Sequence, residues 1–187
     1  MMIVPPFARL LSVGPLILLV FVALAGAGSV AAQNLIPLAK PVKLPPALLH
    51  LPDQPETSLE SVMKKSGQDR YYLLHLWAPS CAACIPEMRQ LDKIHEGLAQ
   101  QGFTVLFVAQ DSSGNFTVPA FSRRHDIATI SSYIDKRATL LNYLQPAGLP
   151  ATYLTTPDGW IIAYHVGSLD WKQMATMAPP AEAKPQR

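Results

Sequence analysis

Residues 76–88 read LWAPSCAACIPEM, and this stretch decides the fold. Cys81 and Cys84 are the only two cysteines of the 187-residue chain, and they are three positions apart. A nearly unbroken apolar and aromatic run, residues 71–77 (YYLLHLW), leads into them, as expected for a strand buried on both faces. Residues 88–100 follow with apolar side chains at helical spacing. The cysteine pair is therefore predicted to lie where a buried strand gives way to a helix.

The elements around this unit alternate between helix and strand. Early crossover helices imply parallel strands, and a late hairpin adds antiparallel ones, so we predict an α/β fold with a central mixed sheet flanked by helices on both faces. The predicted elements are a helix from Thr57 to about Ser66 with a Thr57/Glu60 capping box, a buried strand at 103–109, a helix at 118–125, a β-rich stretch at 127–134, a helix at 136–144, a hairpin of 151–155 and 160–166 with Asp-Gly at its turn, and a closing helix at 169–177.

The N-terminus has the pattern of a secretory signal. Arg9 is its one charged residue, an apolar run covers 10–27, and small residues lead to a cleavage site expected after Ala32. The alternative is an uncleaved membrane anchor, since about 18–20 apolar residues suffice to cross a bilayer. Either reading for residues 1–32 exports the remaining chain to an oxidising compartment, and we expect the bacterial periplasm.

Composition sets the remaining boundaries and excludes several functions. Residues 33–56 are rich in proline and predict an extended tether, residues 57–177 form the folded domain, and residues 178–187 form a disordered tail. The chain has 15 Lys and Arg against 13 Asp and Glu, a balance that gives no reason to expect a nucleic-acid partner. No sustained heptad pattern appears, which favours a monomer.

The cysteine pair by itself is compatible with half of a zinc site, a structural disulfide or a dithiol redox centre. A four-ligand zinc site needs further clustered ligands, whereas the five histidines are scattered singly. A disulfide that closes so short a loop would stabilise the fold little. A redox centre explains the position best, because the start of a helix favours a thiolate at Cys81 and places Cys84 one turn behind it to resolve a mixed disulfide.

Three motifs together resemble a known family. Trp77–Cys84 (WAPSCAAC), Glu87 three residues later, and Gly148–Leu154 (GLPATYL) followed by Asp158-Gly159 are similar to the TlpA/ResA-like family of thioredoxin-fold thiol-disulfide oxidoreductases. The resemblance covers residues 57–177. It implies a thioredoxin-like domain that exchanges disulfides with protein substrates in the periplasm, in cytochrome c maturation or a similar reduction. A membrane thiol protein would supply electrons, and neither a cofactor nor a metal is expected.

The resemblance also assigns roles to single residues. Pro150 matches the family's cis-proline, so the backbone at Leu149 is expected to pair with an extended substrate segment. Glu87 would be a partly buried acid with a raised pKa that accepts the Cys84 proton. Trp77 is expected to cover the cysteine pair and contact substrate, with a simple core position as the alternative. His75, inside the strand, is interpreted as a core histidine.

Three departures from the family leave alternatives open. The intervening dipeptide Ala82-Ala83 has no side chain that tunes the redox potential, so an oxidase or isomerase is an alternative to a reductase. A non-catalytic binding module with a static disulfide is a third possibility. Pro86 is expected near the fifth helical position, where it would remove a backbone hydrogen bond. The stretch before Tyr71 is expected to lack the additional N-terminal strand pair that many relatives carry.

Overall fold

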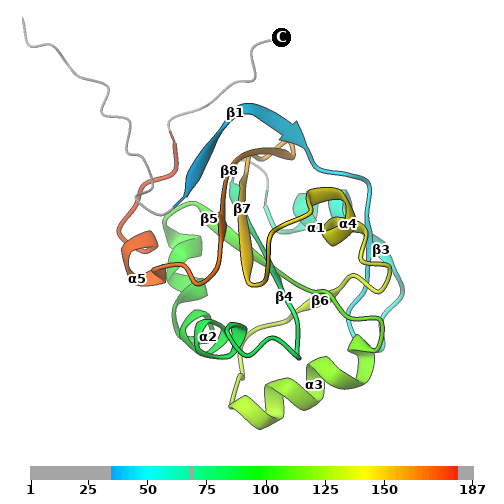
Figure 1. Cartoon of the computed structure of the whole chain (residues 1–187). Helices are drawn as coiled ribbons and strands as arrows, with labels where there is room; N and C mark the ends of the chain where they lie inside the picture. Colours follow the sequence, from blue (N-terminus) through cyan, green and yellow to red (C-terminus); the bar gives the residue numbers. More distant parts are fainter. Residues whose placement is uncertain (1–34, 68–69, 181–187) are drawn as a thin grey trace, which may run out of the picture.

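The computed structural model describes residues 35–67 and 70–180. These residues form a six-stranded mixed sheet with the strand order β1-β8-β7-β4-β5-β6, and helices cover both of its faces (Figure 1). The strands are β1 Ile36–Lys43, β4 Tyr71–Trp77, β5 Phe103–Ala109, β6 Tyr133–Ile134, β7 Ala151–Thr155 and β8 Trp160–Val166. The expected α/β architecture with a mixed sheet is thus confirmed.

Strand β4 is the centre of the molecule. It pairs in parallel with β5 and antiparallel with β7, and all seven of its residues are buried. Because successive side chains of a strand point to opposite faces, β4 contributes to two cores. Leu73 and Trp77 join one core, and Leu74 and Leu76 join the other. This double burial explains why the strand is apolar along its whole length.

The helices divide between these two cores. The first core receives side chains from α2 Cys84–Gln100, α3 Gly114–His125 and α5 Trp171–Met174, and the second from α1 Leu59–Lys65 and α4 Thr139–Leu144. Every predicted helix exists, but their limits differ. Helix α2 begins at Cys84 and α3 at Gly114, four residues earlier than the first apolar position of each pattern. The buried positions of these first turns hold a cysteine and an acid in α2 and a glycine in α3, which an apolar pattern does not report.

The first helix is capped differently from the prediction. Ser58, not Thr57, is the N-cap, and its Oγ accepts a hydrogen bond from the backbone N–H of Ser61 at 3.1 Å. Glu60 forms an exposed ion pair with Lys64 one turn further on, at 2.7 Å. The predicted capping box is therefore wrong, because the helix starts one residue later and Glu60 points along the helix rather than back to the cap.

The predicted tether contains ordered strands, which corrects two expectations. β1 pairs antiparallel with β8 at the edge of the sheet, and β2 Leu48–Leu49 pairs antiparallel with β3 Thr57–Ser58. The stretch before Tyr71 thus has N-terminal strands that the sequence appeared too rich in proline to form. Pro37 and Pro41 are tolerated because β1 is an edge strand whose register shifts between Pro37 and Val42.

The expected signal or anchor at residues 1–32 lies outside the described residues, as does the tail beyond residue 180. Among the residues that the structure describes, none of the helices is both long enough and apolar enough to cross a membrane.

Candidate functional site

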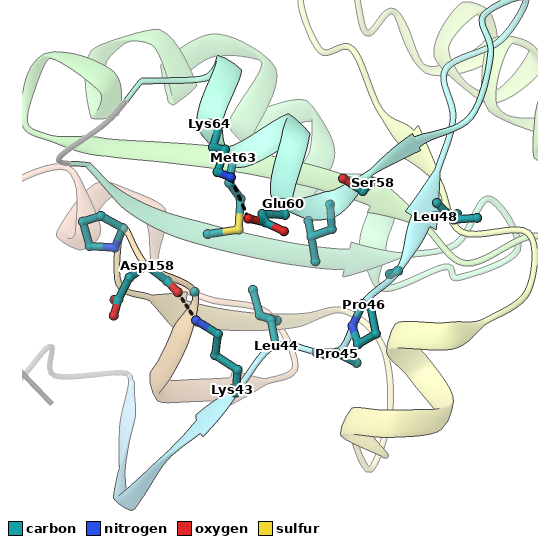
Figure 2. Close-up of a pocket in the computed structure, with 14 residues that line it drawn as sticks. Lys43, Leu44, Pro45, Pro46, Leu48, Ser58, Glu60, Met63, Lys64 and Asp158 are labelled. Carbon is teal, nitrogen blue, oxygen red and sulfur yellow. Dashed lines mark hydrogen bonds and ion pairs between the residues drawn. The ribbon is translucent and has the colours of Figure 1, made fainter. Parts of the chain in front are cut away.

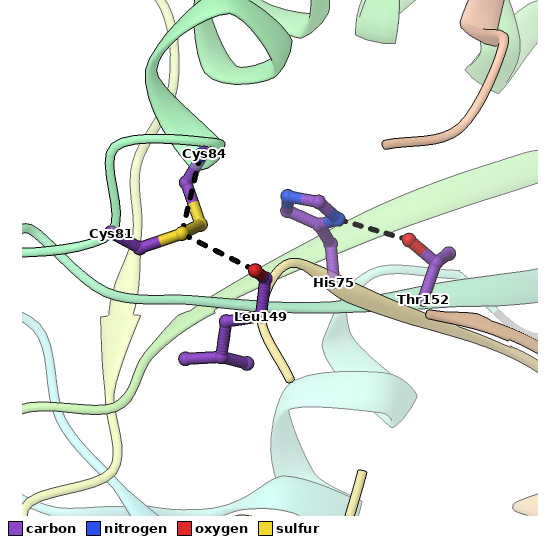
Figure 3. The surroundings of a disulfide bond; sticks show 5 residues. All are labelled: His75, Cys81, Cys84, Leu149 and Thr152. Atoms are coloured by element: carbon purple, nitrogen blue, oxygen red, sulfur yellow. Dashed lines mark hydrogen bonds between the residues drawn. A yellow bond between two sulfur atoms is a disulfide. The ribbon is translucent and has the colours of Figure 1, made fainter. Parts of the chain in front are cut away.

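Cys81 and Cys84 form a disulfide at the end of β4, where the chain turns into α2 (Figure 3). Their Cα atoms are 5.3 Å apart. The two sulfurs differ in access, because Cys81 is half-buried whereas Cys84 is fully buried in the first core. An external thiol or disulfide can therefore reach Cys81, and Cys84 is shielded behind it.

The start of α2 is aimed at Cys81. The backbone N–H of Cys84, the first residue of the helix, donates to the Cys81 Sγ at 3.2 Å. The same N–H also donates to the carbonyl oxygen of Cys81 at 3.1 Å, so the sulfur shares it. The sulfur lies at the positive end of the helix dipole, and both the N–H and the dipole favour its thiolate in the open pair. The geometry is that expected for a nucleophilic Cys81.

Pro86 does not disturb this helix start. Because α2 begins at Cys84, Pro86 is the third helical residue and lies in the first turn. Backbone N–H groups in the first turn have no intrahelical acceptor, so a proline there removes no hydrogen bond. The expected loss of a bond was wrong because it assumed a helix that began two residues earlier.

The segment Leu149-Pro150 lies on the other side of Cys81. Their peptide bond is cis, and the carbonyl oxygen of Leu149 is 3.5 Å from the Cys81 Sγ. Leu149 is half-buried, whereas Pro150 is buried and its carbonyl accepts from the N–H of Gly167 at 2.8 Å. The predicted cis-proline is thus found beside the cysteine pair, with the backbone of Leu149 next to the accessible sulfur (Figure 3).

Glu87 lies one turn into α2 and is only 3% exposed. Its Oε1 accepts hydrogen bonds from the backbone N–H of Leu169 at 3.1 Å and from the indole Nε1 of Trp171 at 2.5 Å. Its Oε2 has no partner among the described residues. Burial raises the pKa of Glu87, and these two donors together with the field of His165 offset only part of that effect. The structure thus contains a buried acid with a raised pKa at this position, and its role as the acceptor of the Cys84 proton stays a prediction.

Trp77 is a core residue and not the predicted cover over the cysteines. Its side chain is 1% exposed, its indole N–H donates to the Ser132 Oγ at 2.9 Å, and its ring packs on Phe121 at a centroid distance of 4.7 Å. The alternation of β4 turns residue 77 into the first core. A side chain so placed supports the sheet beneath the site and cannot touch a substrate.

His75 is fully buried, as expected of a core histidine. Its Nδ1 is 3.0 Å from the Thr152 Oγ1 on the neighbouring strand β7. Burial lowers its pKa to about 3, so the ring is neutral at ordinary pH. Among the described residues, its Nε2 has no hydrogen-bond partner.

A cavity among the described residues lies away from the disulfide. It encloses about 570 Å³ between the end of β1, helix α1 and the β7–β8 turn, and its lining includes Leu44, Pro46, Met63 and Asp158 (Figure 2). None of the residues around the disulfide lines it. Within the described ranges, no group of three or more His, Cys, Asp or Glu side chains could hold a metal ion.

Sequence reasoning did not identify the partners that complete this site. Trp171 and Leu169, which hold Glu87, are more than 80 positions away from it. Thr152 and Ser132, which hold His75 and Trp77, lie in other elements. A small buried hydroxyl or a tryptophan within a short helix has no local signal that points to a contact so distant in sequence.

Comparison with known proteins agrees with this geometry. No family model matches the chain. It is 31% identical to the thioredoxin-like protein YneN of Bacillus subtilis over 127 residues, which cover 64% of this chain and 73% of that protein. It is 24% identical to the thiol-disulfide oxidoreductase ResA of Halalkalibacterium halodurans over 110 residues, which cover 59% of this chain and 61% of that protein.

Solved structures share the fold. A protein from Chlorobium tepidum described as a thiol:disulfide interchange protein DsbE superimposes with a TM-score of 0.59 at 20% identity, over 74% of this chain and 92% of the other. StoA from Bacillus subtilis superimposes with a TM-score of 0.55 at 16% identity, over 71% and 96%. The disulfide at the start of α2, the cis-proline beside it, the shared fold and the relationship to YneN lead to one conclusion: the chain belongs to the TlpA/ResA-like family of thioredoxin-fold thiol-disulfide oxidoreductases.

Proposed function

We propose that this protein is a periplasmic reductase of protein disulfides, serving cytochrome c maturation or a similar reduction. The observation that carries the proposal is the asymmetry of the pair. Cys81 is half-buried, accepts a helix N–H and lies beside the Leu149 carbonyl, whereas Cys84 is buried on the same helix as the buried acid Glu87. One sulfur is built to react with a partner, and the other to release it.

The reaction follows from this division. The Cys81 thiolate attacks one sulfur of the substrate disulfide, forms a mixed disulfide and releases the other substrate sulfur as a thiolate, which takes up a proton. Cys84 then gives its proton to Glu87, and its sulfur attacks the Cys81 sulfur. The second substrate sulfur leaves and takes up a proton from solvent, and Glu87 returns its own proton to solvent. The substrate gains two electrons and two protons, and the protein ends with the Cys81–Cys84 disulfide.

The backbone at Leu149 is proposed to guide the substrate. Its carbonyl oxygen is 3.5 Å from Cys81, and the segment enters β7 directly after Pro150. An extended substrate segment that pairs with this backbone would bring its disulfide to Cys81 by main-chain hydrogen bonds, which suits a protein with several substrates.

The surroundings of the sulfurs favour a reductant over an oxidant. A strongly oxidising pair is one whose reduced form is stabilised, chiefly as a thiolate. Here Ala82 and Ala83 add no charge, and the buried Glu87 disfavours a second anion at Cys84. We therefore expect a potential near that of thioredoxin, about −270 mV, and far from about −120 mV. A membrane-bound thiol protein is proposed to restore the dithiol, and the N-terminal segment to direct the chain to the periplasm.

Two measurements test the proposal. Equilibration of the protein with graded thiol buffers gives its potential, and a value near −120 mV would replace the reductase with an oxidase. Cys84→Ser, expressed in its native envelope, should accumulate mixed disulfides with substrate proteins that a reductant cleaves. The matched variant Cys81→Ser should accumulate none. If neither variant traps a partner and the wild-type disulfide resists thiol buffers, the chain is a binding module with a static disulfide.

A further inference from the structure

The register of β4 brings His75 to the face of the sheet that carries the site. His75 lies on the same face of β4 as Leu73 and Trp77, which belong to the same core as Cys84. Its ring lies edge-on to Phe107 and to Trp171, with centroid distances of 6.1 and 5.7 Å. Trp171 is also the indole that donates to Glu87. His75 and Glu87 are thus two buried polar groups that contact the same tryptophan.

Each of these groups keeps one polar atom without a partner. Among the described residues, the Nε2 of His75 and the Oε2 of Glu87 make no hydrogen bond. Buried polar atoms are nearly always paired, so an unpaired atom at such a place calls for an explanation. Figure 3 shows His75 in the surroundings of the disulfide, with one ring nitrogen bonded to Thr152 and the other on the side toward Cys84.

The burial of His75 decides which proton role it can have. A ring whose pKa is about 3 does not hold a second proton at neutral pH, so it is a poor base for a thiol. A neutral ring carries one proton, on Nδ1 or on Nε2. The hydroxyl of Thr152 can donate to Nδ1, which leaves the proton on Nε2.

We propose that His75, held by Thr152 in the tautomer protonated at Nε2, donates a hydrogen bond to the Cys84 sulfur when the disulfide is open, and so positions that sulfur and stabilises its anion. The inference deepens the proposed dithiol exchange and rests on it. Glu87 and His75 then divide the work. Glu87 receives the proton that Cys84 loses, and His75 holds the negative charge that remains on the buried sulfur until it attacks Cys81.

Other ionisable side chains that lie on the segment of Cys84, or on the elements that pack into its core, have to be distinguished from His75. They are Cys81 and Glu87 on the same segment, His95 further along α2, His125 at the end of α3, and His165 on β8. A readout at the Cys84 Cβ carbon in the reduced full-length protein responds most strongly to this sulfur, and a parallel readout at the Cys81 Cβ carbon separates the two coupled titrations.

The variants His75→Leu and His75→Gln test the donor. Leucine removes it, and glutamine places a neutral N–H₂ group at a similar reach. We expect His75→Leu to lower the thiolate-to-thiol ratio of Cys84 at least tenfold at a given pH, and His75→Gln to restore it to within about threefold of wild type. The matched control His95→Gln, on the same helix as Cys84, should leave the ratio unchanged. A ratio within twofold of wild type in His75→Leu, or a glutamine variant that behaves like leucine, would overturn the proposal.

A measurement on the unaltered protein decides the matter if a variant fails to fold. Nitrogen-15 spectra of the His75 ring should show the proton on Nε2, and its signal should move when the disulfide is reduced and again as Cys84 ionises. A proton on Nδ1, or a ring signal identical in both redox states, refutes the hydrogen bond. If the disulfide exchanges with no thiol at all, the proposed function fails instead, and the tautomer remains readable.

Discussion

The change Glu87→Gln separates the proton-transfer role of this side chain from its place in the fold. Glutamine has nearly the same shape, and its carbonyl oxygen can still accept from Leu169 and from Trp171, as Oε1 does now. The variant loses only the ability to take up a proton. Positioned general bases contribute typically 10²–10⁴-fold. Because the sulfur of Cys84 can also lose its proton to solvent when the site opens, we expect an effect near the lower limit, about 10²-fold at pH 7.

The assay uses the reduced protein and an excess of an aromatic disulfide that releases a coloured thiolate. Attack by Cys81 releases the first coloured thiolate, and attack by Cys84 on the mixed disulfide releases the second. Glu87→Gln should slow the second release and leave the first unchanged. The difference should shrink at alkaline pH, where Cys84 ionises without help. Glu96→Gln makes the same chemical change on an exposed face of α2 and should alter neither step.

Stability gives an independent check with a defined sign. Burial raises the pKa of Glu87 in the folded state. The protonated side chain therefore contributes fully to the free energy of unfolding below the pKa of an unfolded glutamate, and this contribution is lost as the pH rises through the pKa of the folded state. Each tenfold change in proton affinity corresponds to about 1.4 kcal/mol. Urea unfolding should therefore show Glu87→Gln gaining stability relative to wild type as the pH rises from the range in which an unfolded glutamate titrates. A second release within twofold of wild type, together with a flat stability difference, would refute the assigned role.

Three further changes test the supporting structure. Trp171→Phe removes the indole donor from Glu87, so urea unfolding should show a loss of about 1–3 kcal/mol, and carbon-13 titration a still higher pKa of the Glu87 carboxyl. Asp92→Asn weakens the acceptor of three backbone N–H groups at 128–130. Burial raises the pKa of Asp92, but the hydrogen bonds lower the pKa by more than burial raises it. The variant should therefore be less stable than wild type at neutral pH and equally stable once acid has protonated the carboxyl. Gly114→Ala puts a Cβ 2.5 Å from a side-chain carbon at the end of β6, so thermal unfolding should reveal a cost of about 1–3 kcal/mol, whereas Gly97→Ala, which meets nothing within 4 Å, should not destabilise.

The centre of the fold was predictable because its signals are local. The apolar run of β4, the cysteine spacing after it and the apolar period of α2 specify strand, turn and helix with no distant information. The cis bond before Pro150 and the acid at Glu87 came from the family motifs, and the structure contains both features. The limits of helices were less predictable, since the first turns of α2 and α3 bury a cysteine, an acid and a glycine rather than large apolar side chains.

What the sequence concealed depends on contacts across the chain. β1 forms because the edge of β8 is available for pairing, whereas the prolines of this stretch had predicted an unpaired tether. The apolar pattern around Trp77 is the same whether its ring covers the cysteines or packs in the core. Its hydrogen bond to Ser132, 55 positions away, belongs to the core position and has no local signal in the sequence. The unpartnered nitrogen of His75 is likewise visible only when all its neighbours are in place.

The hydrogen bonds that fix Glu87 come from Leu169 and Trp171, which follow it by more than 80 positions. During synthesis, both cysteines emerge from the ribosome long before the two donors that fix this acid exist. A polypeptide that stops short of residue 169 can close its disulfide but leaves the carboxylate unanchored. The acid of the reactive centre is thus fixed by residues more than 80 positions beyond it, so its setting depends on the folding of α5 and of the segment before that helix.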